Sequence, residues 1–133
     1  MREGSTEIFL SDEKADEDHI GVPMILAAAA VHTHLVRKGL RAYASINVRT
    51  AECLDTHHFA VLIGAGATTV NAWLAELSIA DRQARGLCGD IPLDKCIANY
   101  RKAINEGLLK IMSKMGIAVI SSYRGGYNFE AVG

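Results

Sequence analysis

The sequence is poor in aromatic residues, in proline and in long apolar runs. Only 6% of its 133 residues are aromatic and two are proline, although half of the residues are hydrophobic. A buried core must therefore consist mainly of aliphatic side chains. The longest apolar run, residues 22–31, has about half the length that a membrane-spanning helix requires. We therefore expect a soluble chain without a membrane partner, equal in size to one domain or part of one.

An excess of charge of either sign is also absent. The chain has 14 Lys and Arg against 15 Asp and Glu, and its formal net charge is −1. Nucleic-acid-binding proteins carry a basic surface, which this composition does not supply, so we expect no nucleic-acid partner. The one local bias is acidic, between Glu13 and Asp18, and indicates a solvated loop.

Cysteines are few, and no two of them form a CxxC pair. Cys53, Cys88 and Cys96 are odd in number and widely spaced, which favours reduced thiols in an intracellular protein. The first residues are polar and acidic, unlike a secretory signal peptide. Together these features predict a cytoplasmic location.

The first half of the chain has the pattern of a strand–helix–strand unit. Residues 7–10 are predicted to form a short buried strand, and residues 13–21 a loop. A helix is expected from Pro23 to Lys38, ended by Gly39, and a second strand near residues 41–49. This order predicts an α/β fold with a short, mainly parallel sheet and flanking helices.

The second half is predicted to be mainly helical. Residues 56–63 favour a helix, residues 69–77 a second short helix, and residues 81–90 a loop. The longest helical pattern, residues 93–115, ends at Gly116 and places a buried stripe at Ile104, Leu108, Ile111 and Met115. Two further predictions concern the end of the chain. Residues 117–121 are expected to form the third strand, and residues 128–132 to begin a helix.

Three patterns, of histidine, glycine and cysteine, are candidates for a functional site. His32 and His34 point apart on a helix, and His57 and His58 are adjacent, so neither pair has the spacing of two ligands on one helix face. The Gly64-Ala65-Gly66-Ala67 turn lacks the third glycine of a dinucleotide-binding loop. Cys53 lies near His57, but no third catalytic partner accompanies them. The residues alone therefore predict no catalytic, cofactor-binding or metal-binding site.

Several long segments resemble the large subunit of glutamate synthase. They include residues 30–41 (AVHTHLVRKGLR), 57–67 (HHFAVLIGAGA) and 107–117 (GLLKIMSKMGI), followed by SYRG at 122–125 and FEAVG at 129–133. The resemblance covers nearly the whole chain. It implies the end of the central domain of that enzyme, over residues 1–116, and the junction toward its FMN-binding domain, over residues 117–133, as an incomplete domain.

The sequence also departs from the pattern usual in that family. His32-Thr33-His34 replaces three histidines, Ala65 replaces tyrosine, and Ala72-Trp73 replaces Pro-Tyr. Asn47 replaces an apolar strand residue, and residues 126–128 (Gly-Tyr-Asn) replace Ala-Gln-Ile. These positions are expected to affect packing against neighbouring domains and not catalysis.

The resemblance implies a division of labour in the parent enzyme. An amidotransferase domain releases ammonia from glutamine, and the ammonia travels through a tunnel to the FMN domain. There it combines with 2-oxoglutarate, with electrons passed through a [3Fe-4S] cluster from a reductase subunit or ferredoxin. The resemblance implies that this segment is a non-catalytic scaffold and tunnel wall that holds none of these cofactors. The alternatives left open are an independent small α/β binding protein and a histidine-dependent metalloprotein.

A further hypothesis concerns the surface that would meet a neighbouring domain. Six residues are predicted to form it: Lys110, Ser113, Lys114, Tyr123, Arg124 and Phe129. The guanidinium of Arg124 suits a carboxylate across such a contact. Phe129 and Val132 are expected to leave apolar area exposed. The isolated chain is therefore expected to be marginally stable, prone to self-association and inactive.

Overall fold

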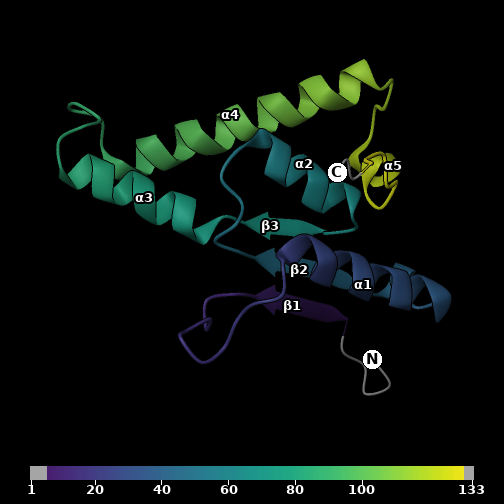
Figure 1. Cartoon of the computed structure of the whole chain (residues 1–133). Coiled ribbons are helices and arrows are strands. Elements are labelled where there is room, and N and C mark those ends of the chain that lie inside the picture. Colours follow the sequence, from purple (N-terminus) through teal and green to yellow (C-terminus); the bar gives the residue numbers. More distant parts are fainter. Residues whose placement is uncertain (1–5, 131–133) are drawn as a thin grey trace.

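A computed structural model describes residues 6–130 as an α/β unit on a three-stranded sheet (Figure 1). The strands are β1 (Glu7–Ser11), β2 (Ser45–Arg49) and β3 (Thr69–Asn71), in this order across the sheet. Both pairs are parallel, with Ile8 opposite Ile46 and Val48 opposite Val70. The predicted α/β fold with a short parallel sheet is confirmed.

Five helices and one short 3₁₀ turn, η1, complete the described residues. Their bounds are α1 (Met24–Arg37), η1 (Arg41–Tyr43), α2 (Thr56–Gly64), α3 (Trp73–Ala84), α4 (Leu93–Lys114) and α5 (Ile120–Tyr123). Helix α1 packs on β1 and β2, and α2 packs on β3. Helices α3 and α4 run side by side, and α4 also packs on α2 (Figure 1).

Four helices end in the same type of hydrogen-bonded turn. After α4, the Gly116 N–H donates to the Ser113 carbonyl at 3.1 Å and the Ile117 N–H to the Met112 carbonyl at 2.9 Å. This is the Schellman motif, which needs a residue in the left-handed region. The glycines at this position are Gly39, Gly66, Gly86 and Gly116. The predicted helix ends at Gly39 and Gly116 are therefore confirmed.

The core has two parts. The larger one lies between the sheet and helices α1 and α2, and its most buried residues are small or aliphatic: Ala28, Ile46, Val48, Cys53 and Ala67. A second cluster joins α2, α4 and α5 through Ala60, Met112 and Tyr123. The scarcity of aromatic residues therefore corresponds to an aliphatic core in which Tyr123 is the largest fully buried side chain.

The sheet is covered unequally on its two faces. Both helices that pack on it, α1 and α2, lie on one side (Figure 1). Side chains that point to the other side include Phe9, which is 71% exposed, and Thr69, whose hydroxyl donates to Asn47 Oδ1 at 2.7 Å. Parallel sheets are normally covered on both faces. The described residues therefore form a small unit consistent with part of a larger domain.

The third strand lies at a different place from the predicted one. Residues 117–119 have no regular structure and residues 120–123 form α5, whereas the third strand is β3. The Schellman turn after α4 holds Ile117 against the second cluster, and the helical turn of α5 brings Tyr123 into that cluster. The β-branched residues Thr68, Thr69 and Val70 favour a strand, but three paired residues are too few to show a period.

Other predicted boundaries are corrected as well. The helix predicted over residues 69–77 begins only at Trp73 and continues to Ala84, so the predicted loop at 81–90 is helical in its first part. Residues 128–130 form no helix, and residues 131–132 of that prediction lie outside the described residues. Met112 takes the buried place predicted for Met115, which is 41% exposed, because α4 ends at Lys114 and Met115 only caps it.

None of the helices within residues 6–130 is both long enough and apolar enough to cross a membrane.

Candidate functional site

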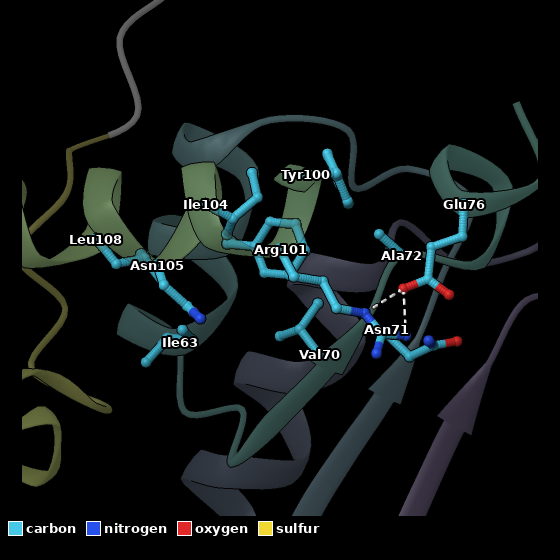
Figure 2. A pocket seen from close by; sticks show the side chains of 11 residues that line it. Ile63, Val70, Asn71, Ala72, Glu76, Tyr100, Arg101, Ile104, Asn105 and Leu108 are labelled. Atoms are coloured by element: carbon cyan, nitrogen blue, oxygen red, sulfur yellow. Dashed lines mark hydrogen bonds and ion pairs between the residues drawn. The ribbon is translucent and has the colours of Figure 1, made fainter. Parts of the chain in front are cut away.

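A groove runs between helix α4 and the outer edge of the sheet (Figure 2). Its volume is about 310 Å³. Apolar side chains come from three elements, with Val70 on β3, Ile63 on α2, and Ile104 and Leu108 on α4. Since β3 pairs with β2 alone among the described strands, its outer edge faces this groove.

One ion pair lies in the wall of the groove. Arg101 on α4 donates from Nε and Nη2 to Glu76 Oε1 on α3, at 2.9 and 2.7 Å. Figure 2 shows both side chains beside Asn71 of β3. The carboxylate of Glu76 is engaged by this arginine. Among the described residues that line the groove, no carboxylate or histidine side chain lies outside this ion pair.

The outer face of α4 carries three of the six residues predicted to meet a neighbour. Lys110, Ser113 and Lys114 are exposed, as is Leu109, whose exposed fraction is 64%. The sequence reasoning missed Leu109, although an apolar residue on the polar side of the helical pattern was its signal. The role of this face as an interface stays a prediction.

The other three predicted residues lie in the segment after α4. Phe129 is 41% exposed and Arg124 is half-buried. Tyr123 is fully buried by the chain itself and presents no surface, because it packs between α2 and α4. Burial raises the pKa of Tyr123, and its hydroxyl has no hydrogen-bond partner among the described residues.

The segment after α5 folds back onto helices α1 and α2. The Gly125 N–H donates to the Ile63 carbonyl at 3.1 Å, and the Tyr127 N–H to the Gly64 carbonyl at 3.2 Å. The Tyr127 hydroxyl lies 3.0 Å from Thr33 Oγ1 of α1. These contacts join positions more than sixty residues apart in the sequence, which no local pattern predicts.

His32 lies at the centre of this docked segment. A Cβ atom added at Gly66 or at Gly125 would collide with its ring, so both backbones approach it closely. Its Nδ1 accepts a hydrogen bond from Arg41 Nε at 3.0 Å. Burial, then Arg41 and then Arg124 lower the pKa of His32. These surroundings favour the neutral imidazole, against which the backbones of Gly66 and Gly125 pack.

His57, His58 and Cys53 make contacts within the fold that account for their positions. His58 and Asp55 form the capping box of α2, and His57 meets the ring of Phe129. Cys53 is fully buried, and burial raises the pKa of its thiol to about 12, so it is a poor nucleophile. Among the described residues no three His, Cys, Asp or Glu side chains come together as a metal site. The thiol of Cys96 donates to the Ile91 carbonyl at 3.7 Å.

Comparison with known proteins decides the family. Residues 1–133 match the family described as the glutamate synthase central domain. The large chain of the NADPH glutamate synthase of Azospirillum brasilense is 64% identical over the whole chain. The chain belongs to the glutamate synthase central domain family. The corresponding chain of Bacillus subtilis (strain 168) is 44% identical, and the chloroplastic ferredoxin-dependent glutamate synthase 2 of Arabidopsis thaliana is 41% identical.

The match covers a small part of each of these relatives. All of this chain aligns with 9% of the length of the Azospirillum, Bacillus and Arabidopsis proteins. The expectation of a segment from a glutamate synthase central domain is confirmed. The alternatives of an independent binding protein or a histidine-dependent metalloprotein are not favoured.

Departures from the pattern expected of the glutamate synthase family fall largely on internal contacts of this chain. Ala65 and Ala72 are buried. Trp73 Nε1 donates to Asp12 Oδ1 at 2.9 Å, and Tyr127 occupies the left-handed region with φ 49°. The side chains at these positions therefore contact other parts of the segment itself. Any effect on neighbouring domains of a glutamate synthase stays a prediction.

Proposed function

We propose that this chain is a scaffold segment of a glutamate synthase large chain. In the proposed parent, glutamine-derived ammonia and 2-oxoglutarate are converted to L-glutamate by domains outside this segment. The segment joins the amidotransferase and FMN domains and forms part of the wall between them. The observation that carries the proposal is the match of all 133 residues to the central domain family.

Two uncovered surfaces support this role. One is the sheet face that carries Phe9, and the other is the outer face of α4 with Leu109 and Lys110. Exposed apolar side chains on a small unit indicate contact surfaces. This chain covers 9% of the length of the Azospirillum protein. In a large chain of that length, residues outside the segment could cover both surfaces.

The division into residues 1–116 and a junction at 117–133 is part of the same proposal. Tyr123 is enclosed by α2 and α4, and the Tyr127 hydroxyl contacts α1. In this proposal the junction is anchored to the central domain up to Phe129, whose ring contacts His57 and Tyr123, and leads toward the FMN domain. Such anchoring would fix the position from which the following domain begins.

FMN and a [3Fe-4S] cluster are assigned to other parts of the proposed parent. An iron–sulfur cluster needs several accessible thiolates. Cys53 does not meet this need, because it is buried and its thiol pKa is about 12. The described residues do not fit such a cluster, and no step of the reaction is assigned to them. A reductase subunit or ferredoxin as electron donor, and a cytoplasmic location, belong to the same proposal.

The proposal is tested in a full-length large chain that contains this segment. The double substitution Lys110→Glu and Lys114→Glu reverses the charge of the outer face of α4. We expect glutamine-dependent glutamate formation to fall, because domain contacts are disturbed, while circular dichroism of the isolated double variant stays that of the wild type. Lys38→Glu, at the exposed end of α1, is the matched control and should retain activity. Full activity of the double variant would contradict the proposal.

A further inference from the structure

A second hollow, of about 300 Å³, lies at the amino ends of the three strands. Its wall includes Glu7 of β1, Ser45 of β2 and Thr68, which precedes β3, together with Arg41 and Arg124. It shares no lining residue with the groove of Figure 2. Ligands of open α/β sheets normally bind at the carboxyl ends of the strands. The position at the amino ends therefore suits a contact site more than an active site.

Arg41 is held in this wall by neutral acceptors. Its Nε donates to His32, its Nη1 to the Ala44 carbonyl at 2.5 Å, and its Nη2 to the Gly66 carbonyl at 2.8 Å and to Thr68 Oγ1 at 3.3 Å. A guanidinium has five N–H donors, so one N–H on Nη1 remains. These bonds fix the orientation of the group but supply no negative charge that would balance its own.

Arg124 places a second positive charge beside the first. Both guanidinium groups line the same hollow, and burial, followed by the charge of Arg124, lowers the pKa of Arg41. Among residues 6–130 neither arginine forms an ion pair. Part-buried charges are normally paired. Two neighbouring guanidinium groups without a carboxylate partner favour the binding of an anion.

We propose that this hollow binds a carboxylate between Arg124 and Arg41. The planar fork of Arg124 supplies two parallel donors to the two carboxylate oxygens, and Arg41 adds its remaining N–H and its charge. Glu7, which also lines the hollow and has an interaction of its own, brings one negative charge to the wall. This charge disfavours a dianion such as phosphate relative to a singly charged carboxylate.

The carboxylate has two sources that share this chemistry. One is an Asp or Glu side chain of a neighbouring domain, an assignment that rests on the proposed function. The other is a small free carboxylate. The side chain of a neighbouring domain is the favoured source, because Arg124 lies in the segment that is proposed to lead toward the next domain. The experiment below separates the two sources.

The test follows the reaction of arginines with phenylglyoxal, read by peptide mass spectrometry. In the isolated 133-residue chain we expect acetate, at constant ionic strength set with chloride, to slow labelling of Arg124 in a saturable manner. Arg82, exposed on α3, is the internal reference and should be unaffected. Arg41→Met should abolish the acetate effect on Arg124. Should this variant not fold, the wild-type result alone decides. Equal labelling of Arg124 in acetate and chloride would overturn the proposal.

The same labelling in a full-length large chain identifies the source. Protection of Arg124 without added acetate, relative to the isolated chain, would show a carboxylate from a neighbouring domain. Labelling that still responds to acetate would show a site for a free carboxylate. Labelling that is fast and indifferent to acetate would overturn the proposal for the assembled protein. Loss of the scaffold role would leave the acetate effect in the isolated chain unchanged, so the two failures are distinguishable.

Discussion

Asp12 connects three parts of the chain at the residue scale. It accepts hydrogen bonds from Thr50 Oγ1 at 2.5 Å, from the Ala51 N–H at 2.8 Å and from Trp73 Nε1 at 2.9 Å. Burial alone would raise the pKa of Asp12, but the bonds from Thr50, Trp73 and Ala51 outweigh it and lower this pKa. The residue therefore ties the end of β1 to the loop after β2 and to the start of α3.

We predict that Asp12→Ala lowers the free energy of unfolding by about 1.5–3 kcal/mol, the range for hydrogen bonds to a charged group. Asp16→Ala, in the exposed loop, is the control and should change it by less than about 0.5 kcal/mol. Urea unfolding followed by the fluorescence of Trp73, the sole tryptophan, measures both. Equal losses in the two variants would contradict the role of Asp12.

His32 makes stability depend on pH. Its pKa in the folded chain is lowered from the ordinary value of 6.5, so the unfolded chain takes up the proton first as pH falls. The stabilisation is fully present above pH 6.5 and is lost as pH falls below it toward the folded-state pKa. The groups that face the ring are Arg41, Arg124 and Tyr127, and both arginines oppose its protonation.

The expected result is that the free energy of unfolding decreases as pH falls from above 6.5 to below it, and that His32→Asn reduces this slope. His34→Asn, exposed on the same helix, should retain the wild-type slope. Urea titrations at a series of pH values give the slopes. A slope that is the same in wild type and His32→Asn would show that His32 does not titrate as described.

At the scale of the elements, the docked segment after α5 depends on a close approach at Gly64. A Cβ atom there would collide with the ring of Phe129, which also contacts Tyr123 and His57. The absence of a side chain at the end of α2 thus allows the segment to lie against the helix.

Gly64→Ala is therefore predicted to displace Phe129 and to speed hydrogen exchange of residues 123–130. The free energy of unfolding should change little, because alanine favours the helix by about 1 kcal/mol relative to glycine and offsets part of the loss. Gly21→Ala, where an added Cβ meets nothing closer than 4.0 Å, is the matched control. Unchanged exchange in Gly64→Ala would contradict the docking of this segment.

Elements with local signals were predictable from the sequence, and those that depend on distant contacts were not. The bounds of α1 and α4 were given to within about two residues, because a proline begins and a glycine ends each of them. Strand β3 was missed because three residues are too few to show an alternating pattern. Its strand structure depends on pairing with β2, which is distant in the sequence. The docking of Tyr127 on α1 was also missed, because it joins residues 94 positions apart.

At the scale of the whole molecule, one face of the sheet and one face of α4 leave large apolar side chains exposed. Phe9 is 71% exposed on the sheet and Leu109 is 64% exposed on α4. The Azospirillum brasilense large chain, 64% identical to this chain, is much longer, and this chain covers 9% of its length. Lys110, Ser113 and Lys114 are exposed, and their role in an interface stays a prediction. The internal position of Tyr123 could not be predicted from the sequence, because burial depends on the fold.

We predict that the outer face of α4 meets a neighbouring domain in a glutamate synthase. This prediction is tested most directly by the rate of lysine acetylation at Lys110 and Lys114, in the isolated chain and in a full-length large chain. Each rate is normalised to the denatured protein. We expect rapid acetylation of both lysines in the isolated chain and acetylation at least about tenfold slower in the full-length chain, a factor that corresponds to about 1.4 kcal/mol of contact. Equal rates in the two proteins would contradict the prediction.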